Sequence, residues 1–318
     1  MPARPAGGPR KAGFKLKRKM KITAILAREY PLILMLLPAV VLVGIYSYGS
    51  MVGTVIAFQR FIPTKGFFGS DWVGLQNFRT LFSMPNFFQV IYNTIRIALF
   101  KMAGGVIVPV LFALLLNEIQ RSRPKRIYQT LVYLPHFLSW IILAGIFKDM
   151  LSRSGIINSF LGTLGVQPVG FLSNQKVFPW TMIVTEIWKG FGFGSIIYLA
   201  ALTGIDPTLY EASTVDGANR LRQTWHITLP GIMSTIVLMS VLSLANILNG
   251  GFDQIYNMYT PAVYATGDIL DTFVYRLGID NAQFALSTAA SLFKSAVSFV
   301  FIVASHWMAN HFTGYRIF

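Results

Sequence analysis

The sequence predicts an all-α integral membrane protein with about six transmembrane helices and both termini in the cytoplasm. Of its 318 residues, 54% are hydrophobic and only 12% are charged, whereas soluble domains carry about a quarter charged residues. Six apolar segments are long enough to cross a bilayer, which takes about 20 residues per helix. The uneven distribution of Lys and Arg between the connections gives the orientation.

The chain begins with a basic segment. Residues 1–29 hold nine of the 27 Lys and Arg, ahead of the first apolar run. We interpret this segment as a cytoplasmic tail beside anionic lipid headgroups. The following apolar run continues to Ala57 without a small-residue cleavage site, which favours a retained signal anchor over a cleaved signal peptide. Since no basic patch with interleaved aromatics follows, we expect no nucleic-acid partner.

Apolar length, more than periodicity, identifies the predicted spans. With the N-terminus inside, the cytoplasmic segments hold 16 Lys and Arg and the outer connections hold seven, as the positive-inside rule expects. In the outer connections, residues 67–82 and 155–164 are expected to form short helices at the membrane interface. The six predicted spans are residues 30–58, 89–117, 127–147, 178–202, 231–249 and 285–311.

Residue types that would support catalysis or metal binding are sparse. Cysteine is absent, so neither disulfides nor thiolate sites are possible. The four histidines fall on different segments, which predicts no metal site. We find no Ser–His–Asp or paired-carboxylate pattern and therefore predict no active site.

A polar segment, residues 211–230, interrupts the apolar pattern on the predicted cytoplasmic side. Pro207 can begin a helix, so residues 209–215 are expected to form a short helix that exposes Glu211. Gly217 fits a left-handed turn after this helix, and a second short helix over 220–226 would lead to the fifth span. The loop is a candidate docking surface for a soluble partner. On residue types alone, an ordinary solvated loop remains the alternative.

The same loop resembles a known family. Glu-Ala-Ser-Thr-Val-Asp-Gly at 211–217, followed after nine residues by Ile-Thr-Leu-Pro at 227–230, closely matches the EAA motif of binding-protein-dependent ABC importer permeases. Ser213 stands where the motif has its second alanine. Segments similar to landmarks of the carbohydrate-uptake branch occur at 73–78, 134–140, 188–192 and 199–207. Residues 251–257 resemble the subgroup for complex oligo- or polysaccharides, which includes lipoprotein-type and alginate importer permeases.

The resemblance implies a type I ABC importer permease fold and a coupling mechanism. The loop at about 204–230 would insert as a coupling helix into a groove on a cytoplasmic ATPase subunit. Glu211 would accept charged contacts, Gly217 would make the turn, and the Ile-Thr-Leu-Pro end would anchor the loop to the next span. The implied ATPase-coupling residues are Glu211, Ala212, Ser213, Asp216, Gly217, Ile227, Leu229 and Pro230.

The resemblance also implies partners. They are a second, related permease in a heterodimer, two ATPase subunits, an extracytoplasmic solute-binding protein and a saccharide substrate, all at a bacterial inner membrane. This chain lacks a Gly-x-x-x-x-Gly-Lys-Ser/Thr loop. We therefore expect no enzyme activity and no cofactor in this chain, with ATP and Mg²⁺ bound by the partner ATPases.

Ionisable residues inside the predicted spans are costly and are functional candidates. Four are cations, and Glu186 is the only acid. Its spacing of three from Lys189 predicts a mutual ion pair, and Lys294 has no obvious local carboxylate. We hypothesise an electropositive path for an anionic saccharide such as a uronate, with snorkelling of Arg96 to the headgroups as the alternative. The four cations are Arg96, Lys101, Lys189 and Lys294.

A saccharide path is also expected to use aromatic faces and amides. Trp188 and Tyr198 in the fourth span and Asn246 and Asn249 near the outer end of the fifth are the candidates. Interface anchoring and interhelical hydrogen bonding are the alternative roles. Gly190, Gly192 and Gly194 lie inside an apolar helix, where glycines let helix backbones approach closely, and Gly190 and Gly194 have the GxxxG spacing.

Two other functional classes remain open from the sequence. A secondary transporter would need coupling carboxylates at the midplane and commonly an inverted repeat. Glu186 is the only acid in the predicted spans and we see no repeat. A membrane scaffold without transport would use the 211–230 loop only to dock a partner.

Overall fold

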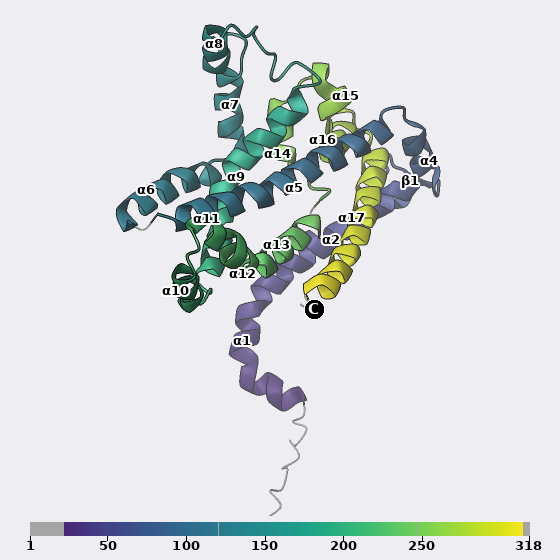
Figure 1. Cartoon of the computed structure of the whole chain (residues 1–318). Helices are drawn as coiled ribbons and strands as arrows, with labels where there is room; N and C mark the ends of the chain where they lie inside the picture. Colours follow the sequence, from purple (N-terminus) through teal and green to yellow (C-terminus); the bar gives the residue numbers. More distant parts are fainter. Residues whose placement is uncertain (1–21, 120, 246, 314–318) are drawn as a thin grey trace, which may run out of the picture. The chain divides into compact units, whose positions relative to one another are not determined.

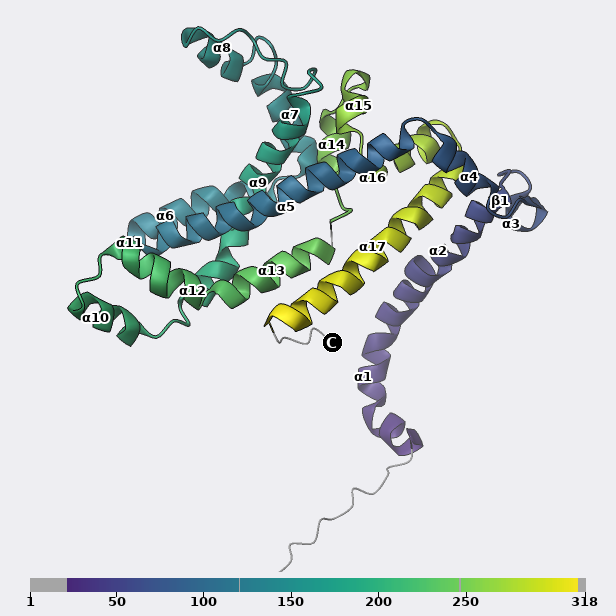
Figure 2. The same cartoon turned by 45° about the vertical axis from the view of Figure 1, so that its right-hand side comes forward.

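The computed structural model describes residues 22–119, 121–245 and 247–313, and its regular structure is almost entirely helical (Figures 1 and 2). It contains two compact units, Met1–Gly53 and Thr54–Phe318. The first unit holds α1 (Ile22–Val43), a π-helical turn (Gly44–Tyr48) and α2 (Gly49–Met51). Side chains such as Met35 and Tyr46 are exposed, which suits a helix surrounded by lipid. Residues 1–21 of the predicted basic tail lie outside the described residues.

The second unit begins with outer elements and is framed by four longer helices. The outer elements are the 3₁₀ helix η2 (Val52–Phe58), the antiparallel strands β1 (Gln59–Arg60) and β2 (Asp71–Trp72), α3 (Gly66–Gly69) and α4 (Gln76–Ser83). The longer helices are α5 (Phe87–Asn117), α9 (Phe178–Leu202), α13 (Met233–Ala245) and α17 (Phe284–Thr313).

Shorter helices connect these four and gather at opposite ends of α9 (Figures 1 and 2). Toward its N-terminal end lie α14 (Phe252–Met258), η5 (Pro261–Val263), α15 (Tyr264–Gly267), α16 (Leu270–Tyr275) and η6 (Arg276–Asp280), with α14 packed beside the first turns of α9. After its C-terminal end come α10 (Pro207–Val215), α11 (Arg220–Gln223), the π-helical turn η4 (Thr224–Thr228) and α12 (Leu229–Gly231). The segment between α5 and α9 holds α6 (Ser122–Tyr133), η3 (Leu134–Phe137), α7 (Trp140–Met150) and α8 (Ile156–Thr163).

Most predicted spans agree with long helices of the structure. Among the described residues, three helices are long and apolar enough to cross a membrane, and two bent helix pairs raise the number to five. The three are Tyr30–Phe58, Phe87–Asn117 and Phe284–Trp307. The predicted fourth span coincides in its bounds with α9, whose 25 residues extend about 37 Å at 1.5 Å per residue, although α9 is not among the helices that meet this length and composition test. The short outer helices predicted over 67–82 and 155–164 are present as α3, α4 and α8.

The third span is not the continuous helix predicted over residues 127–147. Its two halves, Ser122–Phe137 and Trp140–Met150, meet at 102°. Pro135 lies in the 3₁₀ turn between them, and a proline cannot supply the N–H that an uninterrupted helix requires. Ser139 then caps α7 by accepting a hydrogen bond from Ile142 N. The fifth span is also bent, by 56°, between Arg220–Gly231 and Met233–Leu244.

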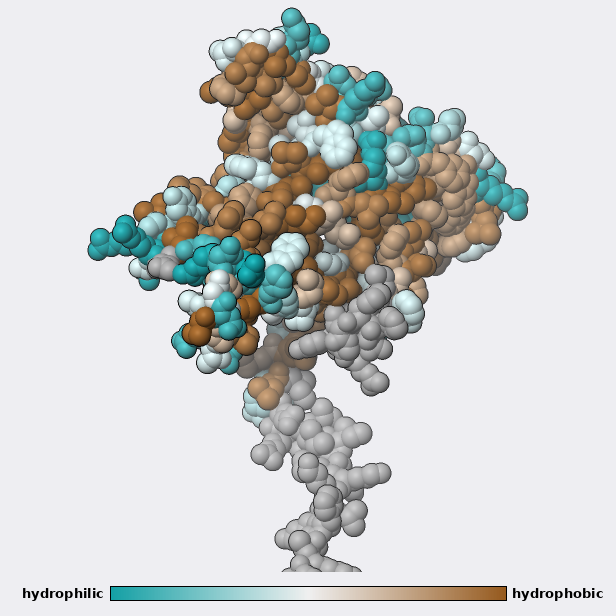
Figure 3. Space-filling view, viewed as in Figure 1, coloured by the Kyte–Doolittle hydropathy of each residue, from teal (hydrophilic) through white to brown (hydrophobic). Residues whose placement is uncertain are grey.

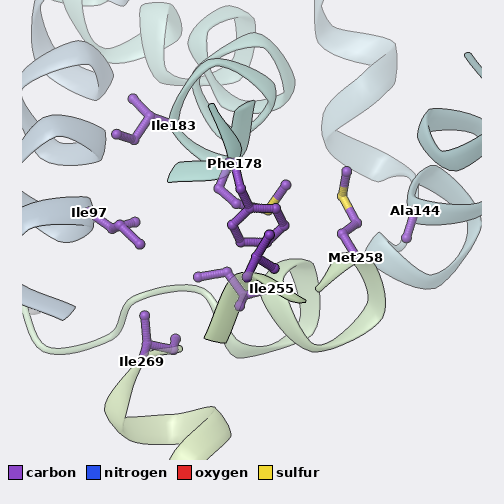
Figure 4. Close-up of a cluster of buried hydrophobic side chains, with 9 residues drawn as sticks. Ile97, Ala144, Phe178, Ile183, Ile255, Met258 and Ile269 are labelled. Atoms are coloured by element: carbon purple, nitrogen blue, oxygen red, sulfur yellow. The ribbon is translucent and has the colours of Figure 1, made fainter. Parts of the chain in front are cut away.

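A buried apolar cluster joins α5, α7, α9 and α14 (Figure 4). Phe178, at the start of α9, is fully buried at its centre. A Cβ added at Gly267 would lie 2.3 Å from the Phe178 ring, so the α15 backbone approaches closely enough to require glycine. The cluster comprises Ile97, Ala144, Phe178, Met182, Ile183, Ile255, Met258, Val263 and Ile269.

Glycines also set the distance between α9 and its neighbours. A Cβ at Gly192 would lie 2.3 Å from the backbone oxygen of Val132 in α6, and one at Gly194 would lie 3.3 Å from Pro109 in α5. A Cβ at Gly190 would meet no described atom within 4 Å. The expected close approach is therefore present at Gly192 and Gly194, and it is absent at Gly190 among the described atoms.

Candidate functional site

The polar loop folds into a compact hairpin over residues 206–228, hereafter the 206–228 hairpin. Asp206 begins α10 by accepting a hydrogen bond from Thr208 N at 2.9 Å, and this bond lowers the pKa of the Asp206 carboxyl. Asn219 caps α11 in the same way through Arg222 N. Between them Gly217 has φ +75°, the left-handed conformation that ends a helix. The two predicted short helices are thus confirmed as α10 and as α11 with η4.

The 206–228 hairpin presents large apolar side chains on its surface. Val215 is 88% exposed, Leu221 77% and Trp225 66%. Hydrophilic side chains gather over α11 of the hairpin and over the start of α6 nearby (Figure 3). Leu221 and Trp225, with Arg222 and His226, line a surface cavity of about 530 Å³. Trp and Arg around an apolar pocket are typical of an interface that another protein completes.

The predicted coupling residues divide between this surface and its attachment to the core. Leu229 packs against a buried cluster that includes Tyr198 and Ile232, while Ile227 is half-buried. Ser213 is half-buried and faces Gln223. The remaining predicted coupling residues, Glu211, Ala212, Asp216, Gly217 and Pro230, are exposed.

A second polar feature lies among α5, α9, α13 and the segment after α13, hereafter the Lys101 cavity. Its volume is about 390 Å³. Lys101 projects toward it from α5 and donates to Gly250 O at 2.8 Å and to Gln254 Oε1. Gln254, fully buried, donates in turn to Met182 O and Thr185 Oγ1 of α9. The lining residues are Ala98, Lys101, Met102, Glu186, Met239, Leu242, Ser243, Ile247, Asn249 and Gly251.

The predicted Glu186–Lys189 ion pair is wrong. Glu186 Oε2 lies 3.7 Å from Lys101 Nζ, while Lys189 Nζ lies 5.3 Å from the centre of the Trp140 ring, a cation–π distance. Because α9 packs against α5, Glu186 pairs with Lys101 and not with Lys189, the partner that spacing along one helix predicts. Glu186 Oε2 is buried and accepts no hydrogen bond from any described residue, while the Glu186 side chain as a whole is 36% exposed.

The expectation that Lys294 lacks a carboxylate is also wrong. Lys294 of α17 pairs with Asp271 of α16 and donates to Asn249 Oδ1 at 3.2 Å. This carboxylate was missed because Asp271 lies in the outer connection, which folds back against α17. Two of the four predicted path cations, Lys101 and Lys294, therefore already have carboxylate partners.

The other predicted path residues are dispersed. Tyr198 is only 2% exposed, within the cluster around Ile232, so it lies in the core. Trp188 is exposed and packs edge-on against Phe147. Arg96 donates to Thr266 O at 3.2 Å and lies over the Tyr92 ring. Asn246 lies outside the described residues.

Several residues of these sites were not among the predicted site residues. Gln254 and Gly251 lie in the 251–257 run that carried the family resemblance, and Gly251 has φ +88°. The apolar surface residues of the hairpin were visible in the sequence as exceptions within a polar loop. Ser243 had no comparable signal, because one serine in an apolar helix usually serves packing.

A framework of membrane-spanning helices and an exposed hairpin suited to a soluble partner indicate the membrane component of a larger assembly. The family described as "binding-protein-dependent transport system inner membrane component" matches residues 105–313. The polygalacturonan/rhamnogalacturonan transport system permease protein YteP of Bacillus subtilis (strain 168) is 40% identical over 299 residues, covering 94% of this chain and 93% of its own.

Solved structures give the same result. A chain from the crystal structure of a bacterial ABC transporter involved in the import of the acidic polysaccharide alginate is 37% identical, with a TM-score of 0.84. The match covers 92% of this chain and 99% of that one. A chain from the alginate transporter bound to an alginate pentasaccharide-bound periplasmic protein is 36% identical, again with a TM-score of 0.84, and covers 93% and 99%. This chain belongs to the family of binding-protein-dependent transport system inner membrane components.

Proposed function

We propose that this chain is the permease subunit of an ATP-driven ABC importer for oligo- or polysaccharides. The observation that carries the proposal is the match over nearly its whole length, with a TM-score of 0.84, to a chain of an alginate ABC importer. The relative YteP is likewise a polysaccharide transport permease by name. The chain would form the translocation path together with a second, related permease.

In this proposal the 206–228 hairpin couples the chain to ATP hydrolysis. Its exposed Val215, Leu221 and Trp225 would enter a groove on an ATPase subunit, with Glu211 beside them to meet cationic side chains. ATP and Mg²⁺ would be bound by a pair of ATPase partners. On the opposite side of the membrane a solute-binding protein would deliver the saccharide. The similar alginate transporter, which forms a complex with an alginate pentasaccharide-bound periplasmic protein, supports this delivery step.

We place part of the saccharide path at the Lys101 cavity. It lies between helices, combines apolar walls with Ser243, Asn249 and Glu186, and so has the mixed lining typical of small-molecule sites. The Glu186 carboxylate, whose side chain is 36% exposed, would accept a hydrogen bond from a sugar hydroxyl.

We further propose that the substrate carries carboxylates. The names of two relatives, for polygalacturonan/rhamnogalacturonan and for the acidic polysaccharide alginate, support this. Two of the four predicted path cations have no carboxylate partner among the described residues. Lys101 and Lys294 have carboxylate partners, whereas Arg96 and Lys189 contact only a backbone oxygen and aromatic rings among the described interactions. These two cations would attract a uronate.

Reconstitution tests the proposal. The complex of this chain with its partner permease, ATPases and solute-binding protein would be placed in proteoliposomes. Uptake of trigalacturonate should require ATP, stop with vanadate and exceed uptake of the neutral galactotriose. Uptake driven by a proton or sodium gradient without ATP would contradict the importer assignment. Equal ATPase stimulation by the two sugars would contradict only the acidic substrate.

A further inference from the structure

We propose that Gln223 is a positioning residue that locks α10 to the segment leading into α13. Through it, a displacement of α10 would be passed rigidly to the membrane-spanning helices. This inference rests on the proposed coupling role of the 206–228 hairpin and assigns the side chain that makes the hairpin move as one body.

Gln223 is buried in a hairpin whose side chains are mostly exposed. Only 6% of it is accessible, although it belongs to the four-residue helix α11. Its Nε2 donates to Ser213 Oγ and to Thr214 Oγ1, both at 3.0 Å. An amide NH₂ group has two hydrogens, so both are used on side chains of α10.

The backbone of α10 orients the two hydroxyls that face Gln223. Ser213 Oγ and Thr214 Oγ1 donate their single hydrogens to Tyr210 O, at 2.9 Å and 2.8 Å. Each hydroxyl oxygen is therefore left as an acceptor facing Gln223. A leucine has a similar size but no donor, and it would leave these two acceptors without their partner. At the half-buried Ser213 this loss costs more than the net value of the bond, whereas water can replace Gln223 at the exposed Thr214.

A second contact continues the connection toward α13. Tyr210 OH lies 3.0 Å from Thr228 Oγ1, and Thr228 is only 4% exposed. The next residue, Leu229, packs against the cluster that contains Ile232 and Leu202. The path therefore runs from α10 through Gln223 and Tyr210 to η4, and from there into the core beside α13.

Ser213 gains a specific role from this arrangement. At this position the motif has alanine, which would leave Gln223 with Thr214 as its only hydroxyl acceptor. In this chain Ser213 supplies the acceptor for one of the two hydrogen bonds by which Gln223 holds α11 to α10. We therefore expect Ser213→Ala to weaken the connection and Gln223→Leu to remove it.

The absence of cysteine permits a direct measurement on the assembled complex in nanodiscs. Spin labels at Thr208→Cys in α10 and Met233→Cys in α13, both exposed positions, report the α10–α13 distance distribution. Gln223→Leu should widen this distribution, and trigalacturonate imported per ATP hydrolysed should fall by about tenfold, equivalent to about 1.4 kcal/mol. Gln129→Leu in α6 is the control for loss of a glutamine amide, since Gln129 is half-buried and lies outside the hairpin.

The outcome separates positioning from simple instability and from failure of the proposed function. Gln223→Leu should assemble with its partners in normal amounts, and adding Ser213→Ala to it should cause no further loss. An unchanged distance distribution and unchanged import per ATP in Gln223→Leu, alongside loss of import in Gly217→Pro, would overturn the positioning role alone. Normal import in Gly217→Pro would overturn the coupling role of the hairpin and the inference together.

Discussion

The 206–228 hairpin and the Lys101 cavity are both polar features of an apolar chain, but they are built in opposite ways. The hairpin comes from one short run of sequence, whereas the cavity joins Lys101 to Gln254, 153 positions apart. The hairpin leaves Val215, Leu221 and Trp225 exposed. In the cavity, the two charged lining residues, Lys101 and Glu186, pair with each other at 3.7 Å. The hairpin is therefore suited to a protein partner, and the cavity to a small hydroxyl-bearing ligand.

The largest expected effect separates the two regions by removing the turn of the hairpin. Gly217→Pro should reduce ATP-dependent import by more than about 100-fold, because proline holds φ near −65° and lacks the N–H that Gly217 donates to Thr214 O. Gly217→Asn is the matched control. Asparagine tolerates the left-handed region, and an added Cβ meets no described atom within 4 Å. Uptake assays check both variants, and normal import in Gly217→Pro would exclude a coupling role.

The same contrast explains how much the sequence could predict. Local signals sufficed for the hairpin, because Pro207, Asp206 and Gly217 act within a few residues of where they stand. They also sufficed for α9, whose bounds match the predicted span. The cavity depends on tertiary packing, which spacing along one helix does not reveal. Glu186 was therefore assigned to Lys189, its neighbour at i+3, although α5 places Lys101 beside it.

The break in the third span was missed for a different reason. Apolar length identified the span, and residues 127–147 are mostly apolar through the region where the helix bends by 102°. The signals that should have divided it, Pro135 and the capping Ser139, occupy only two positions. Both lie in the 134–140 segment that resembles a family landmark. A proline followed by a capping serine predicts the break in the helix, which the family resemblance alone does not.

The next largest effect tests whether Lys101 and its ion pair with Glu186 stabilise the Lys101 cavity. Lys101→Met should reduce the free energy of unfolding by about 3 kcal/mol, because it leaves Gly250 O and Gln254 Oε1 without their donor and Glu186 without its counter-ion. Adding Glu186→Gln should restore part of this loss, since the unpaired charge is then removed. Thermal unfolding of the purified complex measures both. Equal unfolding midpoints for the single and double variants would show that the ion pair contributes nothing.

A smaller effect tests the hairpin as a protein interface. Trp225→Ala should weaken ATPase binding by about 2 kcal/mol, or about 30-fold, without altering stability. Trp72→Ala is a matched control, because Trp72 is 65% exposed and Trp225 is 66% exposed, while Trp72 lies in the predicted outer connection. Binding of the ATPase to the purified permeases, measured by titration, should distinguish them. Equal affinities in the two variants would remove Trp225 from the interface.

The smallest effect concerns the backbone that closes the cavity. Gly251→Ala should destabilise the protein by about 1 kcal/mol, because alanine is strained at φ +88°. Its Cβ would also lie 2.8 Å from Lys101 Nζ, so the lysine must shift, and any import defect should appear as weaker saccharide affinity with the ATPase interface unchanged. Gly190→Ala in α9 is the comparison, since its Cβ has no described atom within 4 Å and alanine favours a helix. If the two variants unfold at the same temperature, the left-handed turn at Gly251 does not stabilise the cavity.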